Sequence, residues 1–115
     1  MQQGSIRLVE AISATGDFIG DGSSAADMLV ATCLAAAAQG DISAFFDLGV
    51  AYSTGSHGVE CDLVEAHKWF NLAAVGGHEE AAMCRHDVAD EMTAREIAEA
   101  QRRAREWLRS ERRAA

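Results

Sequence analysis

Cysteine and histidine are the residues of this chain best suited to metal binding or thiol chemistry. His57, Cys61 and His67 lie around one predicted turn, and Cys84 and His86 follow later. A structural zinc site needs four such ligands that converge, usually in closely spaced pairs. A predicted helix start separates Cys61 from His67, and Cys84 and His86 are two residues apart, so they point to different sides of a helix. We therefore expect no metal and no cofactor.

Simpler roles account for the same residues. Cys61 and Cys84 are expected as small apolar fillers, His57 as a turn residue, and His67 and His78 as surface groups. The alternative to these simpler roles is a metal- or thiol-based sensor that uses Cys61, Cys84 and a nearby histidine.

No set of catalytic residues can be assembled from the sequence. The chain has no GxSxG motif, no GxGxxG motif and no phosphate-binding loop, and no cysteine stands in a context typical of a nucleophile. The acidic pairs Glu79–Glu80 and Asp90–Glu91 are adjacent in sequence, so each pair diverges on a helix. We expect a protein that is not an enzyme.

The charge of the chain is negative and uneven. The formal net charge is −8, with three basic and fourteen acidic residues in 1–91 but seven arginines and four glutamates in 92–115. The acidic majority disfavours binding to nucleic acid or to an anionic membrane. The basic end favours either head-to-tail self-association or an acidic partner. The simpler interpretation is a solvated helix face with ion pairs such as Glu99 with Arg103.

The cysteine count and the N-terminus predict the compartment. Three cysteines, Cys33, Cys61 and Cys84, stand at irregular spacings without a CxxC motif, which argues against a disulfide framework. The first residues, MQQGSIRLVEAISATG, lack the features of a signal peptide, and no apolar run reaches the length of a membrane span. The expected location is the cytoplasm.

Hydrophobic periodicity and the absence of proline predict an all-α chain of about five helices. The expected organisation is a short helix and loop over 1–24, a repeat domain over 25–109 and a frayed tail over 110–115. Helices are predicted at about 25–39, 41–53, 62–75, 79–91 and 93–109. Asp41 is a predicted N-cap, and Asp62 with Glu65 and Thr93 with Glu96 are predicted capping boxes.

Residues 44–81 form a helix, a glycine-marked turn and a second helix. Such a pair cannot bury both of its faces alone, so it must stack on neighbouring helices. A shift by 37 residues places Gly77 on Gly40 and Ala81 on Ala44, so 25–40 matches the second helix of a degenerate earlier unit. Residues 79–109 are expected to form a terminal helix pair.

This unit resembles a Sel-one-like repeat, a short α/α repeat related to the tetratricopeptide repeat. The matching positions are Ala44, Leu48, Gly49 and Tyr52 in the first helix, Gly55, Gly58, Val59 and Asp62 in the turn, and Ala66, Trp69, Phe70, Ala73, Ala74, Gly77 and Ala81 after it. One extra residue separates the two turn glycines. The resemblance implies an α/α superhelix, a solenoid of helix-turn-helix repeats in a short array, which scaffolds protein complexes without catalytic residues.

The first helices of successive units line the concave face of such a solenoid. Phe46, Asp47 and Val50 are therefore the candidate partner-binding residues, which Arg85 and His86 extend. In the favoured alternative, Phe46 packs on the helix at 79–91 instead, because large apolar residues belong more often to the core. The expected function is a non-catalytic interaction module or scaffold for another protein or peptide, and a homo-oligomer is possible.

Overall fold

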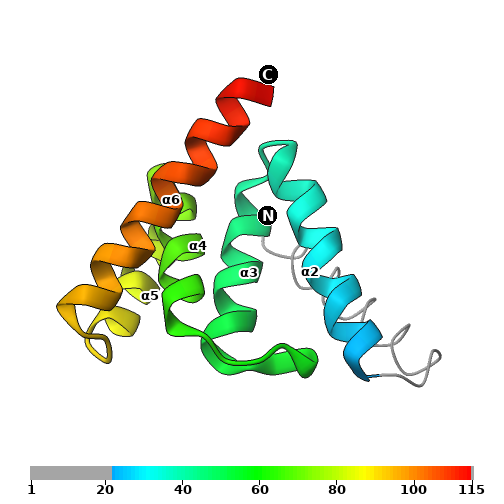
Figure 1. Cartoon of the computed structure of the whole chain (residues 1–115), viewed down its shortest axis with the longest axis horizontal. Helices are drawn as coiled ribbons and strands as arrows, with labels where there is room; N and C mark the ends of the chain where they lie inside the picture. The colour runs from blue at the N-terminus through cyan, green and yellow to red at the C-terminus, as the bar shows by residue number, and fades with distance from the viewer. Residues whose placement is uncertain (1–21, 115) are drawn as a thin grey trace.

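The chain is all-helical, as predicted, in a computed structural model that describes residues 22–114 (Figure 1). The five helices are α2 (Gly22–Ala38), α3 (Ile42–Thr54), α4 (Leu63–Val75), α5 (Glu79–Ala89) and α6 (Ala94–Ala114), with a 3-10 turn at Ser56–Gly58. The short helix and loop expected over 1–24 lie outside the described residues as far as residue 21, and α2 begins at Gly22. Helix α6 continues through most of the segment that was expected to fray, which was 110–115.

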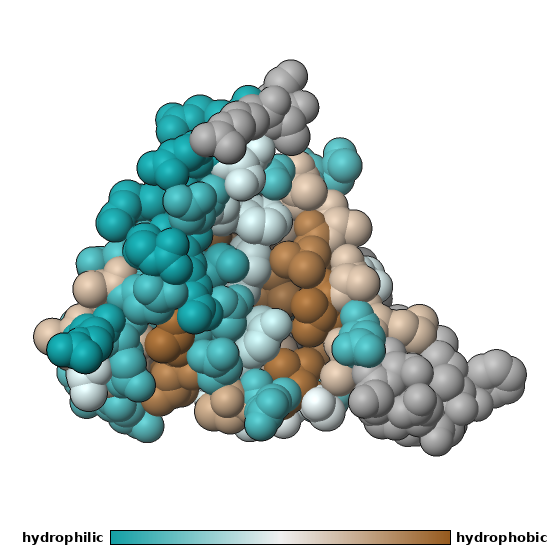
Figure 2. Space-filling view, in the orientation of Figure 1, coloured by the Kyte–Doolittle hydropathy of each residue, from teal (hydrophilic) through white to brown (hydrophobic). Residues whose placement is uncertain are grey.

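Helix α4 is the centre of the structure. It packs against α3, α5 and α6, whereas α2 packs on α3 and on the 3-10 turn. Figure 2 shows hydrophilic residues along α6 and hydrophobic residues gathered over α2 and α3. Helix α4 is therefore covered on several sides by α3, α5 and α6.

Local capping explains where the helices begin. The Asp41 carboxylate accepts from the Ser43 backbone N–H at 3.0 Å at the start of α3. Before α6, the Glu96 N–H donates to the Thr93 hydroxyl at 3.1 Å, and the Thr93 N–H donates to the Glu96 carboxylate at 2.9 Å. This reciprocal pair confirms the second capping box. His78 caps α5, where its Nδ1 accepts from the Ala81 N–H at 3.1 Å.

Only half of the first predicted capping box forms. Asp62 Oδ1 accepts from the Glu65 N–H at 3.2 Å, as expected. The Asp62 N–H, however, donates to the Tyr52 carbonyl at 3.0 Å, so it does not need the Glu65 side chain. The Glu65 carboxylate turns instead towards Trp69 and α6.

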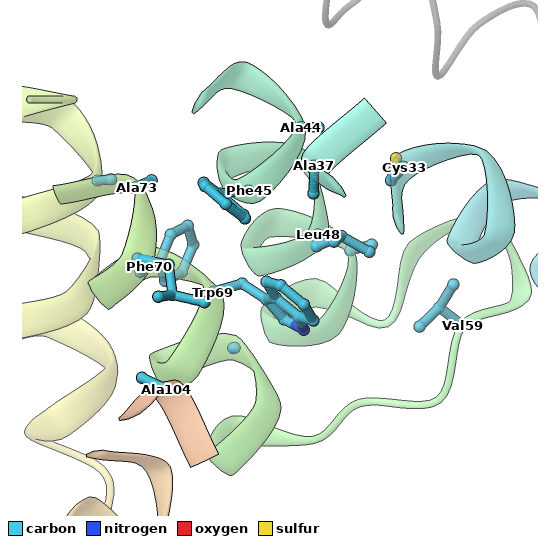
Figure 3. Packing of buried hydrophobic residues seen from close by; sticks show 14 of the residues in the cluster. Cys33, Ala37, Ala44, Phe45, Leu48, Val59, Trp69, Phe70, Ala73 and Ala104 are labelled. Carbon is cyan, nitrogen blue, oxygen red and sulfur yellow. The ribbon is translucent and has the colours of Figure 1, made fainter. Parts of the chain in front are cut away.

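Most of the repeat markers occupy core and turn positions of the α3–α4 pair. Figure 3 shows those of the core, among them Leu48, Trp69 and Phe70. The buried ones are Ala44, Leu48, Gly49, Val59, Ala66, Trp69, Phe70, Ala73 and Ala81. Tyr52, Gly55, Asp62 and Ala74 are half-buried, and Gly58 and Gly77 are exposed. The pattern read from the sequence therefore holds one helix pair together.

Close helix contact depends on one glycine in α3. A Cβ atom at Gly49 would stand 2.5 Å from two ring carbons of Phe70. The aromatic ring of α4 thus lies directly on the α3 backbone, a position that only glycine permits without a shift. Gly49 therefore allows the two helices to approach closely.

The turn between α3 and α4 accommodates its extra residue with a left-handed backbone. Gly55 has φ of 69° and Gly58 has φ of 81°, values that glycine adopts without steric cost. His57, between them, also has a positive φ of 59°. It is the one non-glycine residue with positive φ among residues 22–114.

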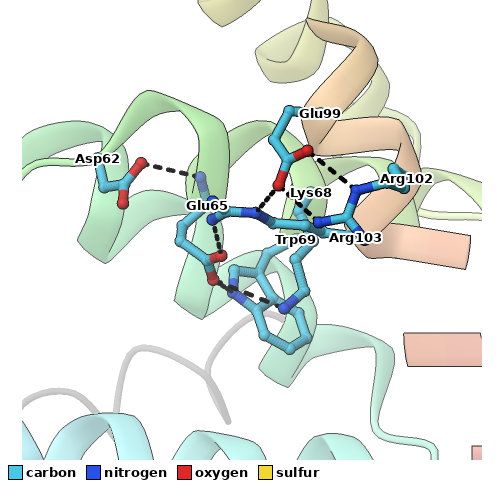
Figure 4. Close-up of polar contacts among 7 residues, drawn as sticks. All are labelled: Asp62, Glu65, Lys68, Trp69, Glu99, Arg102 and Arg103. Atoms are coloured by element: carbon cyan, nitrogen blue, oxygen red, sulfur yellow. Dashed lines mark hydrogen bonds and ion pairs between the residues drawn. The ribbon is translucent and has the colours of Figure 1, made fainter. Parts of the chain in front are cut away.

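A polar network fastens α6 to α4 (Figure 4). Glu65 accepts from Trp69 Nε1 at 3.1 Å and from Arg103 Nη1 at 2.7 Å. Arg103 Nε also donates to Glu99 at 2.7 Å, which confirms the predicted ion pair. The Lys68 ammonium lies 4.2 Å from the Trp69 ring centroid, so the network continues over the aromatic surface.

Candidate interaction groove

A groove of about 410 Å³ lies where α3 and α5 pack on α4. Three helices contribute its walls. The lining residues are Phe46, Val50, Ser53 and Thr54 of α3, Leu63 and Phe70 of α4, Glu80, Cys84, Asp87 and Val88 of α5, and Glu91 just beyond α5. Residues of α3 and α5 therefore face the same hollow.

The floor of the groove is apolar and partly aromatic. The Phe46 ring lies 5.7 Å from the Phe70 ring and stacks on His78 at 4.4 Å, with 13° between the planes. Phe46 and Val50 are half-buried and contact the core while also lining the groove. Phe46 thus packs against α4 and the start of α5, and part of its surface stays accessible.

The α5 side of the groove carries acidic residues. Glu80, Asp87 and Glu91 are exposed, and they recur on the same side of the helix as Cys84. Burial raises the pKa of the Cys84 thiol, and the negative charges of Glu80 and Asp87 raise it further. The groove therefore combines an apolar floor with a negative rim.

The predicted binding residues separate into two groups. Phe46 and Val50 line the groove. Asp47 is buried beside Cys33 of α2, where burial and then the Asp47 charge raise the pKa of Cys33 to about 12. Arg85 Nη1 donates to Asn71 of α4 at 2.6 Å, and His86 is exposed. Neither Arg85 nor His86 lines the groove.

Several groove residues were not predicted from the sequence. Leu63, Val88 and the three acidic side chains were not among the binding candidates, and Phe70 was assigned a structural role only. Cys84, Asp87 and Glu91 follow Glu80 by four, seven and eleven residues, a spacing that places all four on one side of a predicted helix. This spacing was the available signal.

His67 is not a surface group, contrary to the sequence prediction. It is 4% exposed, because α5 covers this side of α4. Burial lowers the pKa of His67, and the nearby Arg85 charge lowers it further. The His67 ring therefore lies where α4 meets α5, in surroundings that disfavour its charged form.

Cys61 and Cys84 line different hollows. Cys61 is exposed rather than a buried filler, and its Sγ donates to the Ser53 carbonyl at 3.7 Å. It lines a hollow of about 530 Å³ between α2 and the α3–α4 connection. Cys84 lines the groove at α5. This placement gives the thiol-based sensor no shared site.

One surface cluster has the atoms that a metal ion needs. His86, Asp87 and Asp90 bring one ligand atom each within 4.8 Å of the others, and all three are exposed. It is the one such group among residues 22–114, and it contains no cysteine. Exposed acidic residues often gather in this way on helix ends, so the cluster does not define a metal centre.

Neither a membrane-spanning helix in the described part of the chain nor a match to a known protein indicates a function for this chain. No helix within residues 22–114 is long and apolar enough to cross a membrane. No model of a protein family, no curated protein and no solved structure matches this chain.

Proposed function

We propose that this chain is a non-catalytic interaction module that holds one segment of a partner protein in the α3–α5 groove. The observation that carries the proposal is the groove itself, with the accessible surfaces of Phe46 and Val50 over its floor. A concave apolar surface between helices is a common docking site for peptides. The rim of polar residues then selects among apolar segments by their charge.

We further propose that the α3–α4 pair is a Sel-one-like unit in a short solenoid. Its support is physical: Gly49 lies under the Phe70 ring, and the turn glycines take positive φ. Helix α2 would be the remaining half of an earlier unit, and α5 with α6 an atypical last unit. A terminal unit has a polar outer face because it meets water, and α6 is hydrophilic along its exposed length (Figure 2).

The test is a selection of peptides from a random library on the intact protein. Bound peptides should lose affinity for Val50→Asp, because a carboxylate on the groove floor opposes an apolar ligand. Val75→Asp is the matched control, since Val75 is 70% exposed and does not line the groove. It should bind the selected peptides as the wild type does.

Thermal unfolding of both valine variants must accompany the binding measurement. Val50 is half-buried, so its variant has to be shown folded at the temperature of the assay. Peptides that bind a folded Val50→Asp protein as tightly as the wild type would place the docking surface elsewhere. A library that yields no binder would reject the proposed function.

A further inference from the structure

We propose that the occupant of the groove is the C-terminal part of α6 from a second copy of this chain, so that copies join head to tail. The proposal rests on the proposed function, because it identifies the partner of the same groove. In this contact the acidic rim of the groove on one copy binds the basic end of α6 on the other.

The groove supplies the negative half. Glu80, Asp87 and Glu91 stand on the α5 side of an apolar floor. The ion pairs within residues 22–114 involve Glu65, Glu99 and Glu106, and none involves a carboxylate of α5. These acidic charges are thus available to an incoming cation.

The end of α6 supplies the positive half. Arg105, Leu108 and Arg112 are exposed and spaced three and four residues apart, so they share one side of the helix. Leu108 is 43% exposed, which is unusual for a leucine in so polar a helix. Neither Arg105 nor Arg112 forms an ion pair with another residue in 22–114. A leucine flanked by free arginines complements an apolar floor with an acidic rim.

The contact has to form between two molecules. No residue of α6 lines the groove of its own chain. Helix α6 is also fixed on α4, because Trp107 packs edge-on against Trp69 at 4.9 Å and Arg103 binds Glu65. Groove and helix end are different surfaces, so the contact is heterologous and leaves a free groove at one end of each assembly and a free α6 at the other.

Sedimentation of the full chain tests the proposal. The mean mass of the wild type should rise between about 10 μM and about 1 mM, the range in which weak contacts assemble. The increase should vanish in about 1 M NaCl, where charge interactions are screened beyond about 3 Å. EDTA in every sample removes divalent ions from the exposed His86 cluster, which shares Asp87 with the groove rim.

Two double variants, each with two charged side chains replaced by uncharged amides, test the two halves of the contact separately. The groove variant carries Asp87→Asn with Glu91→Gln, and the tail variant carries Arg105→Gln with Arg112→Gln. Each should associate at least about tenfold more weakly than the wild type, because each loses the rim charges of one half. An equimolar mixture should form a 1:1 complex and stop there, since it retains one intact groove and one intact α6 end.

A third variant controls for net charge. Glu79→Gln with Asp90→Asn removes the same two charges from residues that do not line the groove, and it should assemble like the wild type. A wild type that stays monomeric, or a mixture that does not form the 1:1 complex, would overturn the self-docking proposal. If library peptides still bind the groove in that case, the proposed function stands and only the identity of the partner is wrong.

Discussion

Two aromatic clusters lie on opposite sides of the same helix pair, and they differ in what covers them. Phe45 and Trp69 face α6, where Trp107 packs edge-on against both rings, at 6.3 Å and 4.9 Å. Their sequence neighbours Phe46 and Phe70 face α5, where the groove remains open. Phe45, Trp69 and Phe70 are 8%, 2% and 2% exposed, so Phe46, which is half-buried, is the ring with accessible surface.

The difference separates structural residues from residues available for binding. The side that α6 closes is sealed by an aromatic ring and by the Glu65–Arg103 ion pair. The α5 side has a histidine stacked on Phe46 and acidic residues around the opening. Adjacent residues in one helix can therefore serve stability on one side and recognition on the other.

The largest expected effect comes from truncating the closed cluster. Trp69→Ala should lower the free energy of unfolding by about 3–5 kcal/mol, because it leaves a cavity under α6 and removes the Nε1 donor to Glu65. Phe46→Ala should cost about half of that or less, since part of its ring is already in water. Urea unfolding followed by circular dichroism measures both values. Equal costs would contradict the distinction between the two clusters.

A smaller loss is expected from adding one methyl group between the helices. Gly49→Ala places a carbon against the Phe70 ring, which must move into the groove or push α3 away. Overpacking of this kind costs about 1–3 kcal/mol. Gly77→Ala is not a suitable control because Gly77 has positive φ, so Ser53→Ala, at a half-buried position of the same helix, serves instead. Alanine is also about 1 kcal/mol more favourable than glycine inside a helix, so a Gly49→Ala protein that is more stable than the wild type would mean that the helices are not in tight contact there.

The ion pair that closes the α6 side should contribute less still. Glu65→Gln, Arg103→Gln and the double variant form a cycle whose coupling energy should be about 0.5–1 kcal/mol. Arg103 is 37% exposed at its side chain, so salt should weaken the coupling. The same cycle on Arg109 and Glu106, an exposed pair within α6, should give a smaller value. Equal values would show that Glu65 does not act as a clamp between helices.

Sequence predicts the features of this fold that depend on short spacings. The capping box before α6 and the ion pair between Glu99 and Arg103 both follow from residues within a few positions of each other. The ion pair between Glu65 and Arg103 could not be predicted in this way, because the two residues are 38 positions apart. The local pattern instead predicted a capping box with Asp62. Long-range pairing of this kind depends on how α6 docks, which no local pattern contains.

The groove was only partly predictable for a related reason. Phe46 and Val50 could be predicted as groove residues from their positions on the helix at 41–53. The residues opposite them could not, because they depend on the rotation of α5 about its axis. The sequence indicated Arg85 and His86, whereas the structure turns Asp87 and Val88 towards the hollow. The same docking buries His67, which looks like a surface residue when α4 is considered alone.

The mildest expected change is a pH dependence that belongs to the open side of α4. The folded state lowers the pKa of His67 below its ordinary value of 6.5, through burial and the charge of Arg85. The unfolded chain therefore binds a proton more readily, so stability is complete above about pH 6.5 and declines as the pH falls below it. Unfolding in urea at a series of pH values measures the decline.

His67→Gln is the variant that isolates this effect, because its stability should decline less than that of the wild type between about pH 6.5 and pH 5. The ion pairs of the α6 side do not interfere in that range. The arginines that bind Glu99 lower the pKa of its carboxyl from 4.5 to about 2, so the stability it contributes is lost only below about pH 4.5. Parallel curves for wild type and variant above pH 5 would mean that proton uptake by His67 does not oppose the packing of α5 on α4.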